Sequence, residues 1–277
     1  MPAELPPKPV HPLKKEATDS LRQLQFIPFE KPGAASVDPN GVLYVADTRQ
    51  NIVQIAPTGQ RLLTYSPPTR GHLAMLEAGL AGKVLAFYDD RQQLALFDRF
   101  LSPLTLLQLT DYPSTATGLT RAATLAPDGT IWLFDERDLS LVHLDPRDPA
   151  SATRTPLDLI LTSAPPDIRA LRAYQNRLYL VDHASGLYVF DIFGAYSRRI
   201  PLPGLTDLQF SADELFFLSP DGRTLRFEPL FAPATTPRAL ALPAAPTGTS
   251  WTRALPGPAN RFYLFSARGI AICTPSP

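Results

Sequence analysis

The sequence predicts an all-β fold, a six-bladed β-propeller with four antiparallel strands in each blade. Two observations predict it. A unit of short apolar segments joined by tight turns occurs six times along the 277 residues. One further apolar segment near the N-terminus belongs to none of the six units, and the last unit lacks one strand, so we expect this N-terminal strand to close the last blade.

The repeated unit is clearest at residues 35–65. Two apolar segments flank the turn Asp-Pro-Asn-Gly at 38–41, a sequence typical of β-hairpins, and the second segment ends at Asp47. Segments 52–55 and 61–65 follow after further polar turns. Four short strands within about 30 residues are what one propeller blade requires.

The unit returns at the spacing expected of blades. Residues 122–135 nearly repeat residues 35–47, including the Pro-Asp-Gly turn and the final Asp. An aromatic residue three positions before the closing Asp or Ser marks the second strand of each unit: Tyr44, Phe87, Trp132, Tyr179, Phe216 and Tyr263. These aromatics are 37 to 47 residues apart, around the period of about 40–45 residues that propeller blades show.

The expected strands give six complete blades only if the ring is closed. We expect the inner strands at residues 34–37, 72–76, 122–125, 167–171, 205–209 and 250–254. The sixth unit stops after a third strand at 270–272, whereas residues 24–29 form a strand without a unit. Pairing these two strands completes the sixth blade and leaves no exposed sheet edge. Two β-sandwich domains would also show apolar alternation, but they explain neither the period nor the strand at 24–29.

Composition limits the classes of partner. The formal net charge is zero, so we expect no strong long-range attraction to nucleic acid or to an anionic membrane, and no nucleic acid as partner. No apolar stretch is long enough for a transmembrane segment. The single Cys273 permits no intrachain disulfide, and its apolar neighbours predict a buried side chain rather than a nucleophile.

Residues 1–21 are predicted to be a disordered, Pro/Lys-rich tail, and residues 22–277 the propeller. The tail has no apolar signal-peptide core. A tail of this kind suits membrane tethering through the N-terminus. The sequence leaves the compartment unknown: the periplasm or cell envelope of a prokaryote if a signal peptide has been removed, and the cytoplasm otherwise.

Polar residues recur at the end of each second strand. They are Asp47, Asp90, Asp135, Asp182, Ser219 and Ser266. Because these side chains can accept hydrogen bonds from backbone N–H groups of a tight turn, we interpret them as turn caps and not as a catalytic ring.

Residues 40–55, Asn-Gly-Val-Leu-Tyr-Val-Ala-Asp-Thr-Arg-Gln-Asn-Ile-Val-Gln-Ile, resemble an NHL repeat, in which a strand ends in an Asp before an Asn-containing turn. The likeness fades toward the C-terminus. The whole chain looks like a divergent member of the six-bladed superfamily that includes NHL, TolB-like and gluconolactonase-type propellers. This resemblance implies the fold over residues 22–277 and no particular activity, because such propellers carry many unrelated ones.

Relatives of the gluconolactonase type bind a divalent cation in the central channel through acidic and Asn side chains of different inner strands. Here Asp207 could stand for one ligand, and no Glu or Asn is expected on the other inner strands to join it. No pair of the four histidines has metal-ligand spacing. We therefore predict no metal site, no cofactor and no catalytic residues.

Arginine dominates the basic residues of the predicted propeller. In propellers, the loops before the inner strands and the turns after the second strands share one face, and we call this the loop face. The turns would add Arg49, Arg91, Arg137, Arg223 and Arg268 to it. Our candidate ligand- or partner-binding residues on this face are Arg70, His72, Arg121, Arg169, Asp207 and Arg253.

The favoured hypothesis is a non-catalytic binding or scaffolding propeller. Its Arg-rich loop face would meet a protein partner or a small anionic ligand. The alternative is a metal-dependent, lactonase-like hydrolase or a lyase with its site at the central channel mouth. A small-molecule sensor module is a third possibility that the residues leave open.

Overall fold

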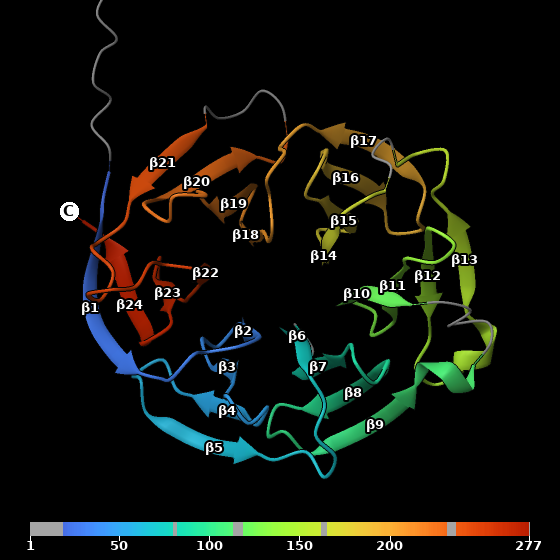
Figure 1. Ribbon diagram of the computed structural model, residues 1–277, viewed down its shortest axis with the longest axis horizontal. Helices are drawn as coiled ribbons and strands as arrows, with labels where there is room; N and C mark the ends of the chain where they lie inside the picture. The colour runs from blue at the N-terminus through green and yellow to red at the C-terminus, as the bar shows by residue number, and fades with distance from the viewer. Residues whose placement is uncertain (1–18, 80–81, 113–118, 162–164, 232–236, 277) are drawn as a thin grey trace, which may run out of the picture.

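A computed structural model describes residues 19–79, 82–112, 119–161, 165–231 and 237–276. In these residues 24 strands form six four-stranded antiparallel sheets. The sheets stand as blades around a central axis (Figure 1). The predicted six-bladed propeller is confirmed.

The strands of each blade are numbered from the axis outward, except that β1 is the outermost strand of blade 6. Blade 1 comprises β2 (Ala35–Val37), β3 (Leu43–Ala46), β4 (Ile52–Ile55) and β5 (Arg61–Tyr65). Blade 2 comprises β6 (Leu73–Ala78), β7 (Lys83–Tyr88), β8 (Gln93–Asp98) and β9 (Pro103–Gln108). Blade 3 comprises β10 (Thr120–Leu125), β11 (Ile131–Asp135), β12 (Ser140–Leu144) and β13 (Thr153–Pro156).

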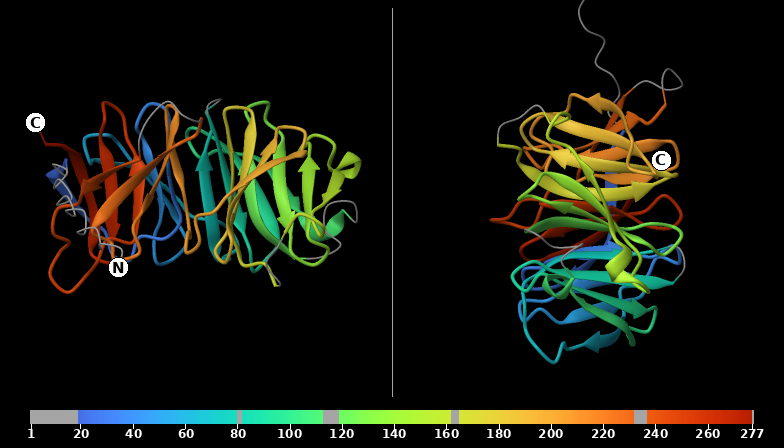
Figure 2. Two further views of the ribbon diagram at one scale, coloured as in Figure 1. Left: turned by 90° about the horizontal axis from the view of Figure 1, so that it is seen from above. Right: turned by 90° about the vertical axis from the view of Figure 1, so that its right-hand side faces the viewer.

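Blades 4 to 6 repeat the plan. Blade 4 comprises β14 (Ile168–Tyr174), β15 (Arg177–Asp182), β16 (Gly186–Asp191) and β17 (Tyr196–Ile200). Blade 5 comprises β18 (Gln209–Ser211), β19 (Glu214–Leu218), β20 (Thr224–Pro229) and β21 (Arg238–Ala241). Blade 6 comprises β22 (Arg253–Pro256), β23 (Phe262–Ser266), β24 (Gly269–Pro275) and β1 (Leu21–Pro28). Two short 3₁₀ helices, η1 (Leu109–Asp111) and η2 (Pro149–Ser151), lie in connections. The blades form a thick disc, and their strands run between its two faces (Figure 2).

The six aligned aromatics hold neighbouring blades together, because each is buried against the following blade. Tyr44 donates a hydrogen bond to the carbonyl of Arg99 in blade 2, at 3.1 Å. Tyr263 donates to the carbonyl of Gly41 in blade 1, at 3.0 Å, across the closure of the ring. The repeated aromatic thus supplies apolar area and, in Tyr44 and Tyr263, a hydrogen bond to the next blade.

The N-terminal strand closes the ring as predicted. β1 pairs antiparallel with β24, from Leu21 opposite Pro275 to Pro28 opposite Gly269, so the strand begins earlier than the expected residue 24. Figure 1 shows β1 on the outside of β24. Residues 1–18 of the predicted tail lie outside the described residues, and its last residue, Leu21, is already the first of β1.

The turn-capping interpretation is confirmed for five of the six closing residues. The Asp47 carboxylate accepts hydrogen bonds from the backbone N–H groups of Arg49 and Asn51, at 2.8 and 2.9 Å. Asp135, Asp182, Ser219 and Ser266 accept equivalent bonds in their own turns. Asp90 differs, because its carboxylate accepts from the N–H of His72, at the start of the inner strand. Asp90 therefore ties two strands together instead of capping a turn.

The inner strands exist in all six blades, but their expected ends were wrong. β6 and β14 run two or three residues further than expected, to Ala78 and Tyr174. β18 and β22 begin several residues later, at Gln209 and Arg253. Cys273 is buried as predicted, and burial raises the pKa of its thiol to about 12. Within the described residues, no helix is both long and apolar enough to traverse a membrane.

Candidate binding channel

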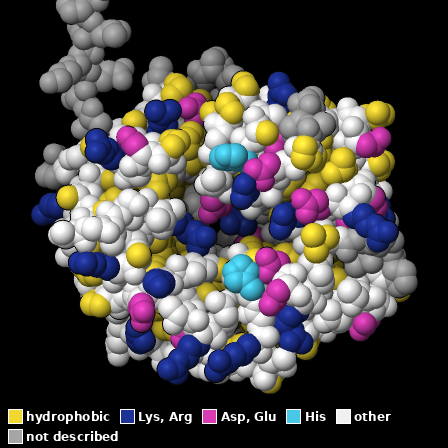
Figure 3. All heavy atoms as spheres, in the orientation of Figure 1, with side chains coloured by type: hydrophobic (Ala, Val, Ile, Leu, Met, Phe, Trp, Pro, Cys, Tyr) yellow, Lys and Arg dark blue, Asp and Glu magenta, His cyan; other side chains and the backbone are white. Residues whose placement is uncertain are grey.

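The inner strands β2, β6, β10, β14, β18 and β22 surround a central channel (Figure 1). Seen down the axis, basic and acidic side chains lie together in and around the central hollow (Figure 3). One mouth of the channel opens on the loop face. The other opens on the face of the turns that join each inner strand to the second strand, which we call the hairpin face.

The loop-face mouth contains a hollow of about 370 Å³. Its lining includes Gln50, His72, Thr252 and Arg253. The His72 ring nitrogen Nδ1 lies 2.7 Å from the Asp89 carboxylate. Arg253 Nη1 donates a hydrogen bond to the carbonyl of Gly33 at 2.8 Å, which holds the guanidinium at the mouth. The hollow therefore presents the permanent positive charge of Arg253 beside the polar side chains of Gln50, His72 and Thr252.

Asp207 lies between two guanidinium groups. Its carboxylate accepts a hydrogen bond from Arg172 Nη2 at 3.2 Å and lies 3.8 Å from Arg253 Nε. The N–H of Leu208 also donates to it, at 2.9 Å. A carboxylate engaged in this way balances the arginine charges within the channel, and both partners are themselves more than half buried.

Of the other candidate residues on the loop face, two arginines are paired with carboxylates and one is exposed. Arg121 lies 3.4 Å from Glu136, and Arg169 lies 2.7 Å from Asp167; both arginines are about half exposed. Arg70 is exposed, and its carbonyl accepts a hydrogen bond from Arg91 at 3.4 Å. The structure therefore brings together His72, Asp207 and Arg253, whereas Arg121 and Arg169 on inner strands are paired with other acids and Arg70 is exposed.

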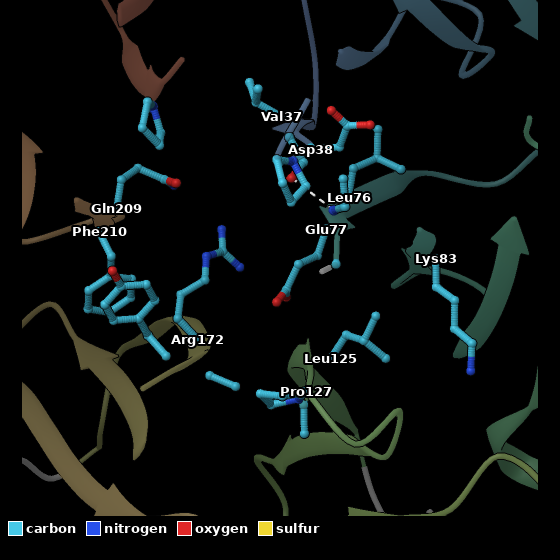
Figure 4. Close-up of a pocket in the computed structure, with 18 of the residues that line it drawn as sticks. Val37, Asp38, Leu76, Glu77, Lys83, Leu125, Pro127, Arg172, Gln209 and Phe210 are labelled. Atoms are coloured by element: carbon cyan, nitrogen blue, oxygen red, sulfur yellow. Dashed lines mark hydrogen bonds between the residues drawn. The ribbon is translucent and has the colours of Figure 1, made fainter. Parts of the chain in front are cut away.

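A larger cavity of about 690 Å³ opens on the hairpin face (Figure 4). Its walls are apolar and aromatic: Val37, Leu76, Leu125, Pro127, Tyr174 and Phe210. Tyr174 and Phe210 stack face to face, with ring centroids 4.3 Å apart. Glu77 and Arg172 point into this cavity from opposite sides (Figure 4). The arrangement, apolar walls with a few converging polar groups, is typical of small-molecule sites.

Glu77 is the most perturbed acid among the described residues. Its Oε1 accepts a hydrogen bond from the Thr124 hydroxyl at 3.0 Å. Burial raises the pKa of Glu77 to about 7, opposed by the positive charge of Arg172 and by the Thr124 hydrogen bond. Thr124 in turn accepts from the N–H of Ala173 at 2.9 Å, so three consecutive inner strands meet at this carboxyl group.

The expectation that no inner strand other than that of Asp207 carries a Glu was wrong, because Glu77 lies on β6. Glu77 and Arg172 each stand one residue beyond an expected inner strand. Glu77 is two residues after Met75, as the next residue of the same strand face would be. The sequence Glu-Ala-Gly, however, is typical of the start of a turn, so the expected strand ended before Glu77. In the described part of the chain, no three His, Cys, Asp or Glu side chains cluster closely enough to hold a metal ion.

Comparison with known proteins finds likeness in structure only. No protein-family model matches the chain, and no curated protein matches its sequence. The NHL resemblance therefore stays a prediction. Many solved structures are similar, at low sequence identity.

Among these is a streptogramin B lyase, with a TM-score of 0.63 at 12% identity, covering 94% of this chain and 98% of that one. Virginiamycin B lyase from Staphylococcus aureus gives 0.62 at 13% identity, covering 92% and 99%. Chaetomium thermophilum Raptor gives 0.62 at 12% identity, covering 94% of this chain but only 30% of Raptor. At these identities the likeness shows the six-bladed propeller fold alone, shared by proteins with different names and sizes.

Proposed function

We propose that this chain is a non-catalytic binding propeller. It holds an anionic group, carried by a small ligand or by a protein partner, at the loop-face mouth of the channel. The observation that supports this most directly is that Arg253 and His72 line one hollow. Arg253 Nη2 makes no hydrogen bond with any described residue, so this guanidinium can still donate to a carboxylate or phosphate.

Only part of the loop face would contact the anionic group. Arg121 and Arg169 already have carboxylate partners, and exposed ion pairs of this kind contribute little to binding or to stability. They serve as a rim that a protein partner would meet, while Arg253 provides the central contact.

The first test uses defined anions. Inorganic phosphate, citrate and glutarate are titrated into the protein by calorimetry, and we expect at least one to bind with a Kd in the millimolar range or tighter. Arg253→Gln should weaken that binding about tenfold or more, because a charge-assisted pair is worth about 1.5–3 kcal/mol. The control Arg226→Gln removes an exposed arginine from the third strand of blade 5 and should change nothing. Binding that survives Arg253→Gln would place the anion elsewhere.

The alternative is a metal-dependent, lactonase-like hydrolase or a lyase acting at the channel mouth. The lyases of the same fold are the reason to keep it. It requires about one equivalent of divalent cation held with the help of Asp207, which here lies against two arginines. Metal analysis of the parent protein and of Asp207→Asn distinguishes the two hypotheses. A divalent cation that is present in the parent and lost in Asp207→Asn would favour the enzyme.

A further inference from the structure

The hairpin-face cavity differs in chemistry from the loop-face mouth. It is almost twice as large, and aromatic and aliphatic side chains form most of its wall. A volume of about 690 Å³ lies within the range of pockets that bury a small organic molecule. The stacked pair Tyr174 and Phe210 provides a flat apolar surface at one side.

We propose that this cavity binds an apolar or aromatic carboxylic acid, whose carboxylate lies against Arg172 and accepts a hydrogen bond from protonated Glu77. The apolar body of the ligand packs between Leu125, Pro127 and Phe210. This site is separate from the loop-face mouth, and it does not require the function proposed there.

Charge balance selects an anionic head group. Inside the channel, Arg172 and Arg253 carry two positive charges, and Asp207 with ionised Glu77 carries two negative charges. A ligand carboxylate would make this group net negative unless Glu77 takes up a proton. With Glu77 protonated, the group is neutral again, and the acid donates its proton in a strong hydrogen bond to the ligand carboxylate. The proton comes from the buffered solution, so proton uptake per ligand bound equals the fraction of Glu77 that is ionised before binding and approaches one only above the pKa of Glu77.

A cationic head group fits the site poorly. Arg172 points into the cavity beside Glu77, and Lys83 also lines it (Figure 4). The remaining acid of the lining, Asp38, already accepts hydrogen bonds from the N–H groups of Asn40 and Val42 in its own turn. An ammonium group would therefore meet the guanidinium of Arg172 beside the carboxyl group of Glu77.

The pKa of Glu77 makes proton uptake accessible near neutral pH. The charged groups that face it from other elements are Arg172, which lowers this pKa, and Asp207, which raises it. Because the pKa is about 7 before binding, protonated Glu77 is the major form at pH 6 and the minor form at pH 8. Affinity for a carboxylate should fall across this interval by about tenfold.

The experiment uses 2-naphthoate as the probe and its neutral amide, 2-naphthamide, as the matched compound. Calorimetry at pH 6, 7 and 8, in two buffers of different ionisation enthalpy at each pH, gives the Kd and the protons taken up. We expect 2-naphthoate to bind about tenfold more weakly at pH 8 than at pH 6, with proton uptake. The affinity of 2-naphthamide should not vary with pH.

Three substitutions separate the contributions of Glu77, Arg172 and the cavity wall to binding. Glu77→Gln keeps a hydrogen-bond donor, so it should keep binding but abolish the pH dependence and the proton uptake. Arg172→Met should weaken binding at least tenfold, since it removes the charge-assisted contact. Pro127→Trp adds bulk at the cavity wall and alters neither charged residue; it should block the probe while circular dichroism and the melting temperature show an intact fold.

Several results would overturn the inference. They are no binding of 2-naphthoate at about 1 mM, binding unchanged by Arg172→Met or by Pro127→Trp, tighter binding of 2-naphthylmethylamine, or a pH dependence that persists in Glu77→Gln. The control Arg226→Gln should leave 2-naphthoate affinity within about twofold. The loop-face mouth is tested with other probes, phosphate, citrate and glutarate, so failure there is distinguished from failure here.

Discussion

At the scale of the residue, Glu77 shows how position alone changes the chemistry of a side chain. Its carboxyl group is enclosed by β6, β10 and β14, and water cannot solvate its charge as it would on the surface. Thr124 provides one hydrogen bond, and Arg172 provides a partly compensating charge. The result is an acid that changes charge near neutral pH.

This placement predicts a pH-dependent stability. The pKa of Glu77 is about 7 in the folded protein, above its ordinary value of 4.5. A raised pKa means that the folded state binds the proton more tightly, so the contribution of Glu77 to stability is present below pH 4.5 and is lost as pH rises through 7. Glutamine cannot ionise. The free energy of unfolding of Glu77→Gln, relative to the parent, should therefore rise between pH 5 and pH 8 by on the order of 3 kcal/mol.

Urea unfolding at pH 5, 6, 7 and 8 measures this difference. The control Glu30→Gln removes an exposed carboxylate and should show no such rise. A constant difference between Glu77→Gln and the parent across the four pH values would contradict the assigned environment of Glu77.

At the scale of the element, β1 decides whether blade 6 is complete. Few residues of this strand meet the core: Leu21 and Ile27 are buried, whereas Leu24 is 46% exposed. Ile27 lies opposite Ile270 of β24 and packs with the blade 6 and blade 1 core. The strand therefore seals the edge of β24 and contributes apolar contacts of its own.

We predict that Ile27→Ala lowers the free energy of unfolding by about 2–4 kcal/mol, because it leaves a cavity at the closure. The control Leu24→Ala, in the same strand, should change it by less than about 0.5 kcal/mol. Denaturant midpoints of the two variants provide the comparison. Equal effects would mean that β1 is not seated in the observed register.

At the scale of the whole molecule, the ends of the propeller lie side by side. The Ser20 carbonyl accepts a hydrogen bond from the N–H of Ser276 at 2.7 Å, and their hydroxyl groups lie 3.0 Å apart. The ring is thus closed by strand pairing, although no covalent bond joins its ends. A covalent link at this point should be neutral, since it requires no movement of the backbone.

A circular permutant tests this closure. Ser276 is joined to Ser20 by a short Gly/Ser linker, and new termini are placed between Arg147 and Asp148, in the turn between β12 and β13. We expect a monomer with one cooperative melting transition, within about 10 °C of the parent. The matched variant that lacks residues 20–28 leaves β24 as an open edge and should aggregate or melt early. Two separate transitions in the permutant would show that the blades do not unfold as one unit.

Much of the architecture could be read from the amino-acid order. The turn at 38–41, the six aligned aromatics and the unpaired strand near the N-terminus are local patterns, and a pattern repeated six times restricts the fold even when single strand ends are wrong. The turn caps followed from the same repetition, except for Asp90, whose partner is His72 on another strand.

Which side chains meet in the channel is evident only from the tertiary structure. Glu77, Arg172 and Asp207 are far apart in the chain. Glu77 and Arg172 stand one residue beyond the expected ends of their inner strands, whereas Asp207, expected within a strand, precedes β18. Strand ends depend on hydrogen bonds to the neighbouring strand, and the channel depends on six strands converging on one axis, so neither leaves a local pattern to read. The repeated local sequence pattern therefore determines the ring of blades, whereas long-range packing determines which charged side chains face one another in the channel.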